Sequence, residues 1–291
     1  MDGGPGGDDE QVRRRRNLAA ELIARSLKGA HRLRRSSALE FRRARAGSLT
    51  FHQPGGAGPR MFVVGSKLGE GGYSTIWKVY ERQPDGGLVS YAVKRVLLDA
   101  SDEEQAAMAE QEISVMESLP PHPNLLALIG SCRRRNKVGR AGLNEVFLLL
   151  ELCRGGNLAS LLIQRVESGR SVTVDQASRT FYDMLLAVAH LHAQPRPLAH
   201  RDVKPENFLL CEKDGRWKLA DFGSASTQPF DYAASDGGAH AASMEEERVH
   251  RFSTPQYRAP EMCDVRSDRI HEKVDIWALG VSLYKILFLQ V

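Results

Sequence analysis

Residues 200–223 constrain this chain more than any other part of its sequence. The stretch opens with His-Arg-Asp-Val-Lys-Pro-Glu-Asn, continues through an apolar Phe-Leu-Leu and closes with Asp-Phe-Gly. Two short apolar runs, 209–211 and 217–220, flank a turn at Asp214-Gly215, which predicts a β-hairpin. The hairpin places Asn207 and Asp221 close together although 14 positions separate them in the sequence.

The polar side chains of this stretch suit phosphoryl transfer. Asp202 lies on a tight loop, where its carboxylate can accept the proton of an incoming hydroxyl. Lys204 can neutralise charge on a transferring phosphoryl group, and Asn207 and Asp221 offer the hard oxygen ligands that Mg²⁺ prefers. Each short motif alone occurs by chance, but the whole set in this order is far more specific.

The charge of the chain is unevenly distributed. The 291 residues are 42% hydrophobic and 26% charged, enough for one large domain or two modest ones. Residues 1–60 hold 12 Arg and one Lys against six Asp and Glu, so they carry +7 and the remainder carries −3 of the total +4. Because the basic residues belong to the N-terminal segment, we do not expect a nucleic-acid partner.

The spacing of the cysteines and the length of the apolar runs limit the cellular locations that we expect. The four cysteines show no paired spacing, which argues against a zinc site or a disulfide framework and favours a reducing compartment. No signal peptide is visible, and the apolar run 276–291 is too short to span a membrane. We therefore expect a cytoplasmic protein. Peripheral membrane contact and a nuclear location stay open as alternatives.

Residues 1–60 form a separate N-terminal extension. Residues 1–10 are Gly-rich and acidic, and we expect them to be disordered. Residues 13–45 are basic with a partial helical stripe, which fits contact with an anionic membrane, a nuclear address or a solvated extension. Residues 46–60 are Gly-rich and predict a linker.

A folded domain is predicted from residue 61, with its first half, 61–150, rich in strands. Strands over 62–68 and 75–80 flank a glycine-rich turn that lets backbone N–H groups approach phosphates. Lys94 interrupts a buried strand and needs an anionic partner. Glu112, on a helix predicted over 101–119, supplies it.

The rest of the chain alternates helices, strands and one long polar segment. Strands are predicted over 125–129 and 146–150, separated by a basic loop at 133–140. The connector 151–156 offers backbone donors and acceptors to a purine ring, and helices follow from 157 and over 177–192. The polar segment 224–251 is long enough to be functional, and a final apolar helix is predicted over 274–291.

All these signatures resemble those of eukaryotic protein kinases, in the same order over residues 68–280. The resemblance implies an α+β, bilobal fold, with an N-lobe over 61–150, a C-lobe over 151–291 and an activation segment at 224–251. Finer motifs are similar to the Numb-associated kinases of membrane traffic: Glu-Gly-Gly-Tyr-Ser (70–74), Leu-Glu-Leu-Cys-Arg-Gly-Gly (150–156), Asp-Phe-Gly-Ser-Ala (221–225), Tyr-Arg-Ala-Pro-Glu-Met (257–262) and Asp-Ile-Trp-Ala-Leu-Gly (275–280).

The resemblance also implies a role for each matching residue. Asp202 and Lys204 are the expected catalytic residues, with Asn207 and Asp221 as ligands of Mg²⁺. Arg201 is expected to pair with a phosphate on the activation segment. The residues expected to bind ATP, or to fix the lysine that binds it, are Leu68, Gly69, Gly71, Gly72, Ser74, Ile76, Ala92, Lys94, Glu112, Glu151, Cys153 and Leu209.

The resemblance leaves two functional hypotheses. The first is an ATP- and Mg²⁺-dependent kinase of serine and threonine residues in proteins, with clathrin-adaptor or other trafficking partners by analogy. The second follows from the C-terminus, because a kinase domain ordinarily continues past the helix at 274–291. On that view the C-lobe is incomplete and the chain is a catalytically weak nucleotide-binding or scaffold fragment, with an exposed apolar patch at residues 283 and 286–289.

Overall fold

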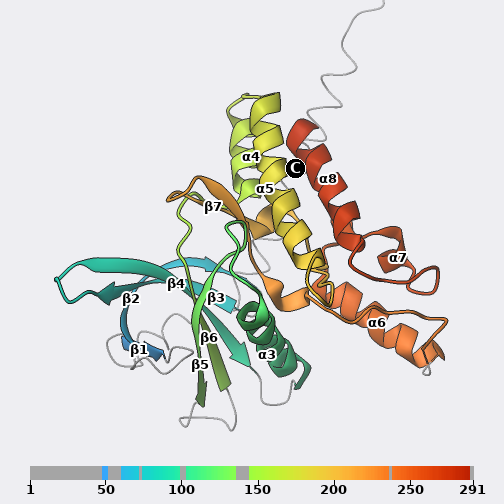
Figure 1. Ribbon diagram of the computed structural model, residues 1–291, viewed down its shortest axis with the longest axis horizontal. Helices are drawn as coiled ribbons and strands as arrows, with labels where there is room; N and C mark the ends of the chain where they lie inside the picture. The colour runs from blue at the N-terminus through green and yellow to red at the C-terminus, as the bar shows by residue number, and fades with distance from the viewer. Residues whose placement is uncertain are drawn as a thin grey trace, which may run out of the picture.

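A computed structural model describes residues 48–51, 60–71, 74–98, 103–135, 144–235 and 238–288. The basic segment 13–45, Gly72 and the predicted start of a helix at 101–102 lie outside these residues. Figure 1 shows a sheet with one helix beside it at one end of the molecule and a group of helices at the other. This two-lobed α+β arrangement confirms the predicted fold class.

The first lobe is a six-stranded antiparallel sheet with one helix packed on it. The strand order is β1-β2-β3-β4-β6-β5. The helix is α3, Glu103–Ser118. The strands are β1 (Ser48–Phe51), β2 (Arg60–Glu70), β3 (Ser74–Arg82), β4 (Leu88–Leu98), β5 (Leu128–Arg135) and β6 (Asn144–Leu150).

Both faces of the sheet are covered, and the strand sequences show why. On β4, Ala92, Val96 and Leu98 pack with Ile113 of α3 in one cluster, while Val93 packs in another cluster on the opposite face. This alternation follows from the two-residue period of a strand. Lys94 lies opposite Ile76 of β3 in the sheet, and its side chain is half-buried among the apolar residues of β4.

β1 falls within the segment that we predicted as a linker, so that prediction was wrong for residues 48–51. The strand pairs with β2 along its whole length. Leu49 and Phe51 are buried, and the Phe51 ring meets Phe62 edge-on at a centroid distance of 5.4 Å. The alternating Leu-Thr-Phe pattern was the signal, but it is too short to distinguish from a loop.

The second lobe is built from helices and one small hairpin. The buried face of α5 packs on α8 in a common core that includes Met184, Leu191 and Leu279. The predicted hairpin forms, with Phe208 opposite Leu219. The elements of the second lobe are α4 (Leu158–Glu167), α5 (Val174–His192), β7 (Phe208–Cys211), β8 (Arg216–Leu219), α6 (Gly238–Phe252), α7 (Pro260–Cys263) and α8 (Val274–Phe288).

The strand predicted over 125–129 is displaced. β5 begins at Leu128 and continues through three arginines that we assigned to a loop. The residues before it instead join the lobes: Leu126 N donates to Leu219 O at 2.9 Å, and Leu219 N donates to Asn124 O at 2.8 Å. Because the hairpin satisfies these backbone groups, they do not enter the large sheet.

α8 is apolar all round, but it buries only one face. Ile286, which we expected to be exposed, is packed in the core, whereas Leu283 is half-buried. Leu287 and Phe288 are exposed as predicted, together with Trp277, and residue 289 lies outside the described residues. Among the described helices, none is long and apolar enough to cross a membrane.

Candidate active site

The loop that begins at His200 is held in place by hydrogen bonds to Asp275, the second residue of α8. The fully buried Asp275 carboxylate accepts from the backbone N–H groups of His200 and Arg201, each at 2.8 Å. It also contacts His192 Nε2 at 3.0 Å. These contacts hold Arg201 at a φ of +66°, a conformation that a non-glycine residue rarely adopts without support.

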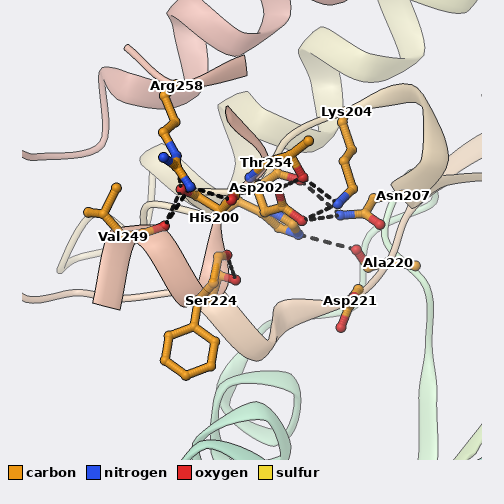
Figure 2. A network of polar contacts seen from close by, with 12 residues as sticks. His200, Asp202, Lys204, Asn207, Ala220, Asp221, Ser224, Val249, Thr254 and Arg258 are labelled. Carbon is orange, nitrogen blue, oxygen red and sulfur yellow. Dashed lines mark hydrogen bonds and ion pairs between the residues drawn. The ribbon is translucent and has the colours of Figure 1, made fainter. Parts of the chain in front are cut away.

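The residues predicted to be catalytic meet around one hydroxyl (Figure 2). Thr254 Oγ1 donates to Asp202 Oδ1 at 2.7 Å and accepts from Lys204 Nζ at 2.7 Å. Lys204 Nζ also lies 2.6 Å from Asp202 Oδ2. The carboxylate and the ammonium group therefore hold an alcohol oxygen between them.

Asn207 is oriented by the same loop. Its amide nitrogen donates to the carbonyl oxygen of Asp202 at 2.8 Å and to Asp202 Oδ2 at 3.2 Å. Because the nitrogen is committed to the loop, the amide oxygen is the atom that remains for a cation. The backbone N–H of Ala220 donates to the Asn207 carbonyl at 2.9 Å, which ties Asn207 to the residue before Asp221.

Lys94 joins the two lobes at this site. Its Nζ lies 2.7 Å from Glu112 Oε1 and 2.8 Å from Asp221 Oδ1. Glu112 is therefore the partner of Lys94, as predicted. Burial alone would lower the pKa of Lys94, but the two carboxylates raise it above its ordinary value. The positive charge of Lys94 lowers the pKa of Asp221 to about 2, whereas burial raises the pKa of Glu112.

Lys94, Glu112, Asp202, Lys204 and Asp221 share one cavity of about 330 Å³, which opens between α3, the glycine-rich turn, the loop after the hairpin and residues 251–254. Gly71 N donates to Ser74 O at 2.8 Å and closes the described part of that turn. The combination of three carboxylates and three cations around one space suits a charged, phosphorylated ligand. The charged lining residues are Lys94, Glu112, Asp202, Lys204, Asp221 and Arg251.

The residues expected around a purine ring lie in or beside one apolar cluster. Ala92 is buried there, with Ile76, Cys153 and Leu209 packed against it. Leu68 and Gly69 lie on β2 beyond this cluster, and 49% of the Leu68 surface is exposed.

Glu151 differs from the expectation in one respect, because its carboxylate supports the connector instead of facing a ligand. Glu151 Oε1 accepts from the Ala127 backbone N–H at 2.8 Å and from Lys218 Nζ at 3.0 Å. The backbone N–H of Glu151 also donates to Ala127 O at 3.1 Å, so the carbonyl oxygen is the group of this residue that is left for a purine.

Sequence reasoning missed the partner of Arg201. The guanidinium donates to Glu245 Oε1 at 2.8 Å and to the Gln228 carbonyl at 2.9 Å, and both charged side chains are buried. We expected a phosphate at this position. The available signal was weak, since Glu245 shares a helix face with buried Ala242 and Val249, but it lies in a run of three acids.

Arg258 binds the C-terminal end of α6. Its guanidinium donates to the carbonyl oxygens of Val249, His250 and Ser253 at 3.0–3.3 Å (Figure 2). A cation that satisfies the last carbonyls stabilises a helix C-terminus. Thr254 follows directly, so α6 is fixed at the point where the chain enters the catalytic cluster.

Comparison with known proteins agrees with this geometry. Residues 62–291 match the family described as Protein kinase domain. Two proteins of Dictyostelium discoideum, each named a probable serine/threonine-protein kinase, are 37% identical over 223 residues and 36% identical over 222 residues. Serine/threonine-protein kinase AKL1 of Saccharomyces cerevisiae is 39% identical over 198 residues.

These alignments cover 76%, 76% and 67% of this chain, but 19%, 26% and 17% of the relatives. The chain therefore spans about a sixth to a quarter of the length of the curated relatives that it matches.

Proposed function

Because this chain belongs to the protein kinase domain family, in its serine/threonine type, we propose that it transfers the terminal phosphoryl group of ATP to serine or threonine hydroxyls in proteins. One observation carries the proposal. The hydroxyl of Thr254 lies between the Asp202 carboxylate and the Lys204 ammonium group, so this pair of side chains accommodates an aliphatic alcohol. A substrate hydroxyl has the same chemistry.

The roles of the residues follow from their charges. Asp202 accepts the hydroxyl proton as the oxygen attacks, and Lys204 neutralises the negative charge that develops beside it. Lys94 lines the same cavity, where it would hold the ATP phosphates while Glu112 keeps its ammonium group in place. Asp275 holds the loop that presents Asp202, so the base is positioned before substrate arrives.

The donor set fits Mg²⁺. The amide oxygen of Asn207 and the carboxylate of Asp221 are hard oxygen ligands, and Asp221 lines the cavity. When bound with ATP, Mg²⁺ neutralises phosphate charge and orients the transferring group. Asn207 and Asp221 would hold the ion, and Glu112 would remain a carboxylate partner of Lys94.

The finer motifs support a narrower proposal, a role in membrane traffic. The segments 70–74, 150–156 and 221–225 are similar to those of the Numb-associated kinases, which suggests adaptor proteins of clathrin-coated membranes as substrates by analogy. The basic segment 13–45 would then bring a cytoplasmic enzyme to an anionic membrane.

A second function has one observation in its favour. The second lobe exposes large apolar side chains on α8, including Trp277, Leu287 and Phe288. A nucleotide-binding or scaffold protein with little catalysis would present such a surface to a partner. Asp202→Ala separates the two functions, because it removes the base and leaves the nucleotide contacts in place.

The first experiment is thermal unfolding of residues 1–291 with and without Mg·ATP. At about 100 times its Kd, Mg·ATP should stabilise the wild type by about 2.7 kcal/mol, and Asp221→Asn should lose most of this shift. In a phosphoryl-transfer assay, Asp202→Ala should lose about 10²–10⁴-fold in rate while its Mg·ATP shift is retained. Equal transfer by wild type, Asp202→Ala and Lys94→Met would refute the enzyme, and a retained shift would then favour the scaffold.

A further inference from the structure

Two cysteines that are far apart in the sequence lie close together where the connector 151–156 meets the hairpin. Cys153 lies on this connector, and Cys211 ends β7. The ligand atoms of Glu151, Cys153 and Cys211 all lie within 4.8 Å of one another. Sequence spacing gave no sign of this cluster, because the tertiary fold alone brings the connector against the hairpin.

The backbone holds the two segments in register. Gly155 N donates to Leu210 O at 3.1 Å, and Leu210 N donates to Gly156 O at 2.9 Å. The approach is so close that a Cβ on Gly155 would lie 2.7 Å from Leu210 Cβ and Cγ. The thiol groups are therefore carried by two segments that are already fixed to each other.

We propose that Glu151, Cys153 and Cys211 form a zinc site that joins the connector to the β7–β8 hairpin. Thiolates and carboxylates are common zinc ligands, and three protein ligands with water in the fourth position is the coordination that zinc has in catalytic sites. Zinc–sulfur bonds of about 2.3 Å place the donors of a tetrahedral site roughly 3.5–4 Å apart. Since the donors here are within 4.8 Å, small side-chain rotations complete the site.

Lys218 is the group with which zinc competes. Its Nζ lies 3.0 Å from both carboxylate oxygens of Glu151 and 3.6 Å from Asp214 Oδ2. The ammonium group can thus move towards Asp214 when zinc takes a Glu151 oxygen. Burial raises the pKa of the Cys153 thiol to about 12, and the negative charge of Glu151 adds to this effect, so the free thiol is protonated. Zinc binding displaces the thiol protons into solvent.

Zinc at this position would act on the nucleotide site through geometry. The connector carries the backbone groups expected to face a purine, and Leu209, two residues before Cys211, packs in the adjoining apolar cluster. An ion that links both segments would restrict their relative movement. Zinc binding can be measured directly, so its test does not require catalysis.

The test uses the reduced, metal-free chain 1–291 and Zn²⁺ itself. Zinc affinity is measured by competition with a chromophoric chelator. Alkylation followed by mass spectrometry identifies the protected thiols. We expect one ion per chain, with Cys153 alkylated more slowly with zinc than without it and with Cys132 and Cys263 unchanged. Cys211 is buried and therefore protected in both states, so its role is read from the variants. Bound Cd²⁺ should give the ultraviolet charge-transfer absorption of a thiolate complex.

Variants separate this site from adventitious binding. Cys153→Ser and Cys211→Ser should each weaken zinc binding beyond the roughly 10–100-fold loss typical of outer-shell changes. Glu151→Gln keeps an acceptor for the Ala127 N–H but removes the charge, so it should also weaken binding. Cys132→Ser and Cys263→Ser are matched controls that should bind zinc like the wild type.

Three results would overturn the proposal. They are a rate of Cys153 alkylation that saturating zinc leaves unchanged, unchanged affinity in the double variant Cys153→Ser/Cys211→Ser, and equal loss in the control variants. If a serine variant fails to fold, the protection pattern of the wild type and the affinity of Glu151→Gln decide the outcome.

Discussion

The guanidinium of Arg201 donates to the carboxylate of Glu245 at 2.8 Å, and both side chains are more than nine-tenths buried. This ion pair links the catalytic loop to α6, a helix within the segment where an added phosphate was expected to bind Arg201. A carboxylate carried by the chain itself thus occupies the position facing Arg201. α6 is therefore held against the loop that begins at His200 by two side chains of the chain itself.

Glu245→Gln should destabilise the protein strongly. Removing one partner of a buried ion pair leaves the other charge unpaired, which typically costs about 3–5 kcal/mol. We expect a lower free energy of unfolding in urea and faster proteolytic cleavage within α6. Glu247→Gln is the matched control, because Glu247 lies on the same helix but is exposed. Equal stability of the two variants would contradict a structural role for the Arg201–Glu245 pair.

Asp275→Asn should loosen the catalytic loop. The Asp275 carboxylate accepts from two backbone N–H groups, whereas an asparagine has one acceptor oxygen and directs an NH₂ group at the other donor. A buried unsatisfied donor costs about 1–3 kcal/mol. The melting temperature should fall, and amide hydrogen exchange at His200 and Arg201 should accelerate. Slow exchange at both amides in a folded variant would count against this account.

The contact between Lys94 and Asp221 should depend on pH in the acid range. Lys94 lowers the pKa of Asp221 from 3.8 to about 2, so the carboxylate binds its proton less readily in the folded state. Its stabilising effect is therefore complete above pH 3.8 and is lost as pH falls towards 2. Because half of the Asp221 side chain is exposed, solvent reduces the size of the effect.

Unfolding of wild type and Asp221→Asn in urea checks this pH dependence. Without metal, the difference in unfolding free energy between them should be constant near neutral pH and should shrink as the solution is acidified below pH 3.8. If the difference in unfolding free energy instead grows on acidification, folding raises the pKa of Asp221 and does not lower it.

Two glycine substitutions should have opposite effects. Gly155→Ala places a Cβ 2.7 Å from the Leu210 side chain, and overpacking of this kind typically costs about 1–3 kcal/mol. Gly280→Ala on α8 meets nothing within 4 Å and should stabilise that helix by about 0.5–1 kcal/mol. Thermal unfolding of both variants tests the pair. Stabilisation by Gly155→Ala would show that the connector is not held against β7.

Local sequence alone determined much of the candidate site. The spacing from Asp202 to Asp221 predicted a loop followed by a hairpin, and both form. The isolated charge of Lys94 in an apolar strand predicted an anionic partner, and Glu112 is that partner. Such predictions succeed because strand period, turn residues and the energetic requirement to pair buried charges act over short stretches.

The contacts that hold the site together were decided by tertiary structure. Glu245 lies 44 residues from Arg201, and Asp275 lies 75 residues from His200, and each is one of many acids along the chain. Nothing in the local pattern selects the acid that becomes buried beside a given partner. That choice depends on how the helices pack around the loop, as does the approach of Cys153 to Cys211. Short sequence motifs thus determine which chemical groups the site contains. Its rigidity arises from contacts that exist only once the lobes have folded.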